Sequence, residues 1–267
     1  MKASPQSQSN GSCAEAIVAG HSGAGHSGTL REGNSAGEGN AGGEEKRLEE
    51  MSAFFNHRAE IYDEVHPEHL GGGMESKRII ASFLPEHTKT IMDFGIGTGL
   101  ELESIFRRFP DIEVTGLDIA DQMLGRLREK YPDKGIKLYC ESYLTYDFGE
   151  CRYDAALSLM TLHHYAHNTK KDLYRRIHRC LKPSGVYVEC DYMLHGDDYA
   201  NAQEIEDANF AAYKRLKEEL GITDNKEYHF DTPCTVENQK GMLSDAGFSD
   251  VKEMWHIGNT VILVAYR

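Results

Sequence analysis

The sequence lacks several features that would place the protein at a membrane, outside the cell or on nucleic acid. No apolar run approaches the roughly 20 residues that span a membrane, and the N-terminal residues lack the apolar segment of a secretory signal and the Arg-rich character of a transit peptide. The six cysteines contain no C-x-x-C pair, which favours a reduced chain. A formal net charge of −14 disfavours a phosphate-backbone partner. We therefore predict a cytoplasmic protein with no membrane partner.

Composition divides the chain into two parts. Residues 1–43 are rich in Gly and Ser and contain few large apolar side chains, so they cannot bury enough surface to offset their ordering entropy. We predict a disordered extension there. Residues 44–267 are numerous enough to form one domain with a sizeable core.

A buried strand that runs into a glycine-rich turn stands at Thr90–Gly99, followed by helical periodicity over 100–109. A dinucleotide-binding fingerprint, G-x-G-x-x-G, would need glycine where this chain has Leu100. Asp93, just before the first glycine, would repel a phosphate but could hold an ammonium group. The turn therefore favours a ligand with a cationic group rather than a pyrophosphate.

The segment D-F-G-I-G-T-G resembles motif I of the class I S-adenosylmethionine-dependent methyltransferases. The next predicted strand, 113–118, ends in Asp118, whose carboxylate can accept hydrogen bonds from both hydroxyls of a ribose. The resemblance implies S-adenosyl-L-methionine as cofactor, with Asp93 at its amino-acid end and Asp118 on its ribose. It also implies an α/β, Rossmann-like, doubly wound and mostly parallel seven-stranded sheet with an antiparallel last strand. The glycines that would let the cofactor approach the backbone are Gly95, Gly97 and Gly99.

The resemblance extends cofactor contact to further residues. Tyr62, in a Y-D pair, either covers the cofactor or packs in the core, and Met123 either contacts the adenine or fills the core. Ser142 stands where related sequences usually carry an acidic residue for the adenine amino group. The remaining implied contacts are Ile119, Tyr143 and Ser158.

Two histidines follow another predicted strand, Tyr153–Met160. Ligands of open α/β sheets lie beyond the carboxyl ends of the strands, so His163 and His164 are expected near the chemistry, and the segment resembles motif IV of the same family. Either histidine has a suitable intrinsic pKa for a general base, while structural roles remain open for both. No metal site is predicted, because His57, His66 and His69 are read as solvated loop residues.

Outer elements complete the prediction. We expect a helical cap over 44–88, containing helices at 44–62 and 75–84, and an acceptor-side insertion over 193–234, containing a helix at 197–220. Thr235 is expected to cap the next helix. A β-hairpin is predicted at the C-terminus, with its turn at Gly258.

The favoured function is methyl transfer from S-adenosylmethionine to a small-molecule acceptor. One alternative is an enzyme that modifies the wobble uridine of transfer RNA, since nucleic acid is disfavoured but not excluded. Another is a non-catalytic module that binds S-adenosylmethionine or S-adenosylhomocysteine. A nicotinamide oxidoreductase would require the missing glycine pattern. A homodimer is kept open.

Overall fold

The computed structural model describes residues 47–65 and 71–267, and residues 47–267 form one compact unit. The predicted extension at 1–43 lies outside the described residues, as do His66 and His69. Within the described ranges, no helix has both the length and the apolar character needed to cross a membrane.

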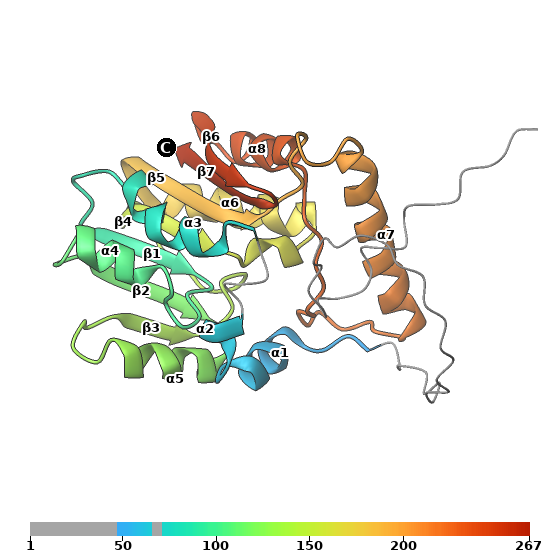
Figure 1. The fold of residues 1–267 in the computed structure, drawn as a ribbon, viewed down its shortest axis with the longest axis horizontal. Helices are drawn as coiled ribbons and strands as arrows, with labels where there is room; N and C mark the ends of the chain where they lie inside the picture. The colour runs from blue at the N-terminus through green and yellow to red at the C-terminus, as the bar shows by residue number, and fades with distance from the viewer. Residues whose placement is uncertain (1–46, 66–70) are drawn as a thin grey trace, which may run out of the picture. The chain divides into compact units, whose positions relative to one another are not determined.

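A seven-stranded sheet forms the centre of this unit, in the order β3-β2-β1-β4-β5-β7-β6 (Figure 1). The first five strands in this order pair in parallel, whereas β7 pairs antiparallel with both β5 and β6. This topology confirms the predicted fold class. The strands are β1 (Thr90–Phe94), β2 (Glu113–Asp118), β3 (Lys137–Cys140), β4 (Tyr153–Leu159), β5 (Leu181–Tyr192), β6 (Asp250–Ile257) and β7 (Thr260–Tyr266).

Helices cover both faces of the sheet, because central strands such as β1 and β4 bury side chains on both sides. One face packs against α3 (Gly73–Ile79), η2 (Ile80–Phe83), α4 (Leu102–Arg108) and α5 (Asp121–Lys130). The other face packs against α6 (His167–Cys180) and α8 (Val236–Asp245). Beyond the carboxyl edge of the parallel strands lie α1 (Met51–Arg58), α2 (Tyr62–Val65), η3 (Leu162–His164) and α7 (Ala202–Glu219) (Figure 1).

Three predicted helices differ from the observed ones. The helix expected at 44–62 begins only at Met51, because Glu50 forms a β-bridge with Tyr228 and the Met51 amide donates to the Glu227 carbonyl. The helix expected at 75–84 continues as the 3-10 turn η2 after Ile79. The helix expected at 197–220 starts at Ala202. Tertiary pairing and local turns, which leave no periodic signal, set these boundaries.

Two predicted local features are confirmed. Thr235 is the N-cap of α8, and its Oγ1 accepts a hydrogen bond from the Asn238 amide at 3.2 Å. The terminal hairpin joins β6 to β7 through Gly258, whose φ of 55° lies in the left-handed region that glycine adopts without strain.

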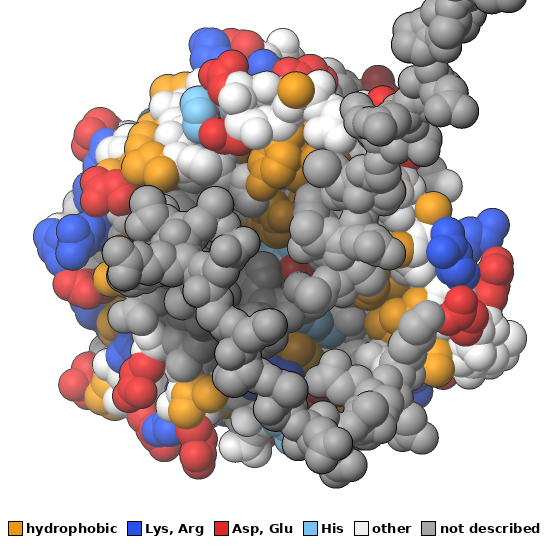
Figure 2. Space-filling view, turned by 45° about the vertical axis from the view of Figure 1, so that its right-hand side comes forward, with side chains coloured by type: hydrophobic (Ala, Val, Ile, Leu, Met, Phe, Trp, Pro, Cys, Tyr) orange, Lys and Arg blue, Asp and Glu red, His pale blue; other side chains and the backbone are white. Residues whose placement is uncertain are grey.

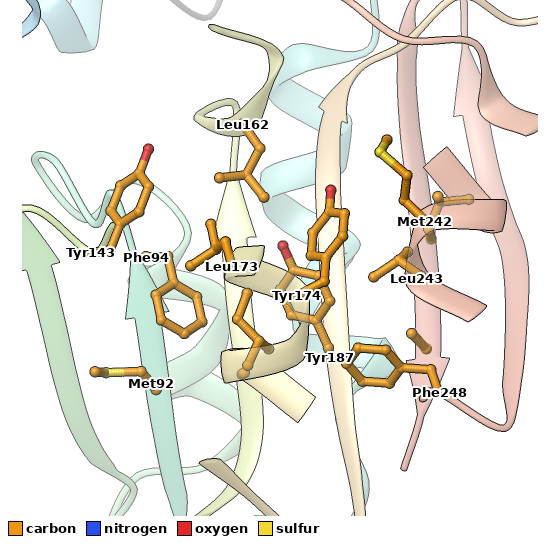
Figure 3. Packing of buried hydrophobic residues seen from close by; sticks show 14 of the residues in the cluster. Met92, Phe94, Tyr143, Leu162, Leu173, Tyr174, Tyr187, Met242, Leu243 and Phe248 are labelled. Atoms are coloured by element: carbon orange, nitrogen blue, oxygen red, sulfur yellow. The ribbon is translucent and has the colours of Figure 1, made fainter. Parts of the chain in front are cut away.

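Aromatic side chains fill the core on the α6 side of the sheet, where Tyr187 packs beside Tyr174 and Phe94 lies in the same cluster (Figure 3). The Tyr174 hydroxyl donates to the buried Glu189 carboxylate at 3.0 Å, and the Gln239 amide also donates to Glu189. Burial raises the pKa of Glu189 to about 8. These hydrogen bonds satisfy the polar groups buried between β5, α6 and α8.

Candidate active site

A cavity lies at the carboxyl edge of the sheet, where the strand order reverses between β1 and β4. Such a switch point is where open α/β sheets bind ligands. About 450 Å³ of empty space, which includes open solvent, lies between the lining residues of this cavity. It is lined by Met51, Phe55, Tyr62, Gly95, Gly97, Asp118, Ile119, Met123, Tyr143, Leu159, Met160, Thr161, His164 and Tyr165.

The glycine turn forms the floor of the cavity because its backbone crosses the end of β2. The Gly95 amide donates to the Leu117 carbonyl at 2.8 Å. A Cβ at Gly95 would lie 2.3 Å from Thr161 Oγ1, and the φ of Gly95 is +70°. Both the steric limit and the left-handed conformation therefore require glycine at this position.

Asp118 ties the turn to β2 and faces the cavity. Its Oδ2 accepts from the Gly97 amide at 2.9 Å, and its Oδ1 accepts from the Ala120 amide at 2.8 Å. Burial raises the pKa of this carboxyl to about 6, although the backbone hydrogen bonds oppose the increase. Each oxygen keeps acceptor capacity for a ligand hydroxyl.

Two buried carboxyl groups lie behind the turn. Asp93 is 1% exposed and Glu101 is 2% exposed, and neither Asp93 oxygen has a hydrogen-bond partner. Burial, reinforced by the charge of Glu101, raises the pKa of Asp93 well above its usual range. An unpaired buried carboxyl group beside a ligand cavity suits a ligand that brings a cation.

The α2 segment is fastened over the turn through Asp63, whose Oδ1 accepts a hydrogen bond from Thr98 Oγ1. The Lys130 ammonium lies 2.5 Å from the other Asp63 oxygen and 2.9 Å from the Thr98 carbonyl. These contacts hold the neighbouring Tyr62 against the cavity.

On the opposite side of the cavity, η3 places two histidines next to each other with ring centroids 4.0 Å apart. The His163 Nδ1 lies 2.6 Å from Asp191 Oδ1. Burial alone would lower the pKa of His163, but the charge and hydrogen bond of Asp191 outweigh it and raise the pKa. His164 lines the cavity, and burial together with the charge of His163 lowers its pKa.

The segment before α8 completes this side. Asp231 Oδ1 lies 3.1 Å from His164 Nδ1 and 3.9 Å from His229 Nε2. Glu227 accepts hydrogen bonds from the Ser142 hydroxyl and the Tyr165 hydroxyl, both at 2.5 Å. The segment thus reaches both the β3 loop and η3.

The structure brings eight of the residues proposed from the sequence to the cavity wall and places five elsewhere. Gly99 packs against Leu102, and Asp93 lies behind the turn. Ser142 bonds to Glu227, and the buried Ser158 hydroxyl lies 2.6 Å from Tyr187 Oη. His163 contacts Asp191 instead of the cavity. Those on the wall are Tyr62, Gly95, Gly97, Asp118, Ile119, Met123, Tyr143 and His164.

Sequence reasoning missed Asp231 and Glu227 as site residues. Both belong to 225–234, a loop with no periodicity, and their partners are distant in sequence. Met160 is another residue without a sequence signal: it lines the cavity with φ of 51°, a strained conformation for a non-glycine residue.

Comparisons with known proteins agree with this geometry. Residues 91–185 match the family described as methyltransferase domain. The carboxy-S-adenosyl-L-methionine synthase of Campylobacter concisus is 24% identical over 205 residues, covering 71% of this chain and 82% of the relative. The phosphoethanolamine N-methyltransferase of Plasmodium falciparum is 22% identical over 198 residues, covering 73% of this chain and 72% of the relative.

Solved structures extend the likeness over most of the chain. A candidate O-methyltransferase from Nostoc punctiforme superposes with a TM-score of 0.60 at 22% identity, over 82% of this chain and 62% of that chain. This chain therefore spans about three fifths of the length of that structure. Residues 91–185 thus match a methyltransferase domain, and the chain has the fold of the class I S-adenosylmethionine-dependent methyltransferases. S-adenosylmethionine is the cofactor of that class.

Proposed function

We propose that this protein transfers a methyl group from S-adenosylmethionine to a small-molecule acceptor. The observation that carries the proposal is that one cavity is lined by Asp118 and the glycine turn on one side and by His164 on the other. A donor held by the first group would meet an acceptor held beside the second.

The residues present suit the donor. The two oxygens of Asp118 can accept hydrogen bonds from a ribose, and the unpaired Asp93 carboxyl suits the ammonium group. Ile119 and Met123 supply apolar surface for an adenine ring. Bound S-adenosylmethionine supplies an electrophilic methyl group on a sulfonium centre.

The remaining wall is suited to positioning an acceptor. Phe55 and Met51 of α1 are apolar and limit the access of water to the cavity. His164 presents a polar edge for an acceptor hydroxyl or amine, and the Asp191 contact orients the adjacent His163. Transfer then depends on holding the nucleophile in line with the methyl group.

Charge and shape favour a small acceptor over nucleic acid. The net charge is −14. Acidic and basic side chains of the described residues are interspersed along the outline of the face that Figure 2 shows. A phosphate backbone would gain little from such a surface. We infer that 193–234 is an acceptor-side insertion and that residues 44–88 act as a cap. A homodimer and a cytoplasmic location stay predictions.

The test is calorimetric titration of the full chain with S-adenosylhomocysteine. Asp118→Ala is expected to weaken binding about a hundredfold, because two charge-assisted hydrogen bonds are lost. Asp121→Ala, at the exposed start of α5, is the matched control and should bind normally. Absence of binding by the folded wild-type protein would refute the proposal. Binding without transfer to any acceptor in a broad panel would favour the non-catalytic module.

A second candidate function is formation of a carboxylated S-adenosylmethionine. It is supported by the similarity to the Campylobacter concisus carboxy-S-adenosyl-L-methionine synthase, which extends over 71% of this chain. Mass spectrometry of the nucleoside released from protein purified from cells distinguishes the two. A cofactor heavier by one carboxyl group would favour the synthase and, with it, the transfer RNA alternative.

A further inference from the structure

Three imidazoles surround one carboxylate oxygen beside the cavity. Asp231 Oδ1 lies 3.1 Å from His164 Nδ1, 3.6 Å from His163 Nε2 and 3.9 Å from His229 Nε2. His163 and His164 are 6% and 5% exposed. These residues come from η3 and from the loop before α8, so only the fold brings them together.

The separations match the edges of a metal coordination shell. Four ligands about 2.0–2.1 Å from a tetrahedral ion lie about 3.3 Å from one another. His164 Nδ1 and Asp231 Oδ1, both buried, contact each other at 3.1 Å through a side-chain hydrogen bond. Because metal ligands must be deprotonated, an ion that binds here would replace the proton between these two atoms and take both as ligands.

The surrounding residues hold the ligands in position. Asp191 contacts His163 Nδ1 and accepts from the Leu162 and Tyr192 amides at 2.8 Å, which leaves His163 Nε2 turned toward Asp231. A carboxylate on the far nitrogen is the usual arrangement behind a metal-bound histidine. The Thr232 amide also donates to the His163 carbonyl at 2.7 Å, which ties the two segments together.

His229 is fixed as well, because its ring stacks on Phe54 with centroids 3.4 Å apart. An ion that displaces the proton from His163 would leave the two carboxylates Asp191 and Asp231 to balance its charge. Nitrogen-rich sites of this composition prefer zinc and similar transition metals to magnesium or calcium.

We propose that His163, His164 and Asp231 bind one divalent transition-metal ion and leave one coordination position open. Two other groups among the described residues could ligate a metal, but Glu206 of the first is occupied by the Thr235 amide, and Asp198 of the second is exposed. The His163 group combines buried histidines, closely spaced ligand atoms and a supporting carboxylate.

The ion would lie next to the methyl-transfer cavity, since His164 belongs to both. An open coordination position there could hold an acceptor oxygen or nitrogen, as in metal sites that orient a substrate. This role rests on the proposed function, whereas metal binding itself does not.

The test is titration of the chelator-treated full chain with Co²⁺, followed by visible absorption and calorimetry, without methyl donor or acceptor. We expect one strong site with the absorption of tetrahedral cobalt. Asp231→Asn, which keeps the side-chain shape, should weaken binding at least a hundredfold, and His229→Ala, which alters only a neighbour of the ligands, about tenfold. The exposed His87, before β1, provides the control, and His87→Ala should bind cobalt normally.

Circular dichroism verifies that each variant is folded. No saturable binding by the wild-type protein, or equal affinity in Asp231→Asn, would overturn the proposal. Loss of cobalt binding only in His195→Ala would also overturn the proposal, because it would place the ion at His195, Asp198 and His256. Titration with S-adenosylhomocysteine is scored separately, so failure of the metal site and failure of the methyl-donor site remain distinguishable.

Discussion

The two sides of the cavity are built in different ways. The proposed cofactor side, formed by the turn after β1 and by Asp118, comes from one strand-helix-strand unit and uses backbone amides. The proposed acceptor side, formed by η3 and residues 225–234, uses side chains that meet across long sequence separations. His163 is 28 positions from Asp191 and 69 positions from Thr232.

This difference explains which side of the cavity can be predicted from the sequence. A backbone that passes close to other atoms at positive φ needs glycine, so the cofactor side leaves a local pattern. A cluster of side chains from separate segments needs no particular spacing. The acceptor side therefore leaves no pattern, and its chemistry becomes visible only after folding.

The largest expected effect comes from the cofactor side. Gly95→Ala would place a Cβ 2.3 Å from Thr161 Oγ1 and 2.8 Å from Thr161 Cβ. With the added cost of positive φ, we expect the free energy of unfolding to fall by about 3 kcal/mol or more. Urea denaturation measures the change.

Gly97→Ala is the matched comparison, because its nearest neighbour outside the turn is Asp118 Oδ2 at 3.9 Å. Only the conformational cost, about 1 kcal/mol, is expected there. Equal destabilisation by both substitutions would show that close packing does not distinguish the two glycines.

A smaller effect is expected on the acceptor side. The buried Glu206 of α7 accepts from the Thr235 amide at 2.6 Å and from Asn238 Nδ2 at 3.0 Å. Glu206→Ala leaves the buried Thr235 amide without its acceptor and should lower the free energy of unfolding by about 2 kcal/mol. Thermal denaturation should show little change for Glu204→Ala, an exposed residue of the same helix.

The affinity for S-adenosylhomocysteine tests whether the two sides of the cavity are independent of each other. Folded Glu206→Ala protein should keep wild-type affinity, since Glu206 does not line the cavity. A large loss of affinity would mean that the two sides are coupled, contrary to their separate construction.

The smallest effect is a pH dependence of cofactor binding. Burial raises the pKa of Asp118 to about 6, so this carboxyl takes up a proton as the pH falls through 6 and then loses acceptor capacity. Affinity for S-adenosylhomocysteine should be nearly full above about pH 7, about half at pH 6 and about tenfold lower at pH 5. Calorimetry at both pH values measures it. Because Glu101 also titrates, with a pKa of about 7, Asp118→Asn is the control that should remove this component.

The sequence predicted the fold through particular residues. Asp93 and the glycines after it indicated the turn that follows β1, and Asp118 indicated the end of β2. Alternation of strand and helix signals then gave the sheet class. Helix boundaries were less predictable: α1 begins at Met51 because of the bridge between Glu50 and Tyr228, a contact that no local propensity encodes.

Individual site residues divide in the same way. Gly95 and Gly99 look alike in the sequence, yet a Cβ at Gly95 would strike Thr161 across the cavity, whereas one at Gly99 would strike Leu102 in the core. Ser158 follows the family resemblance but bonds to Tyr187. The sequence predicts where a residue lies along a strand, but it does not predict which residue its side chain contacts.

By itself, the sequence determined the class of sheet, the glycine turn and the acidic end of β2, because these depend on contacts within a few residues and on backbone conformation. Only the tertiary structure decided that His163, His164, His229 and Asp231 meet at one point. That convergence depends on how a loop folds back on η3, and it follows from packing free energy summed over the whole domain rather than from any local preference.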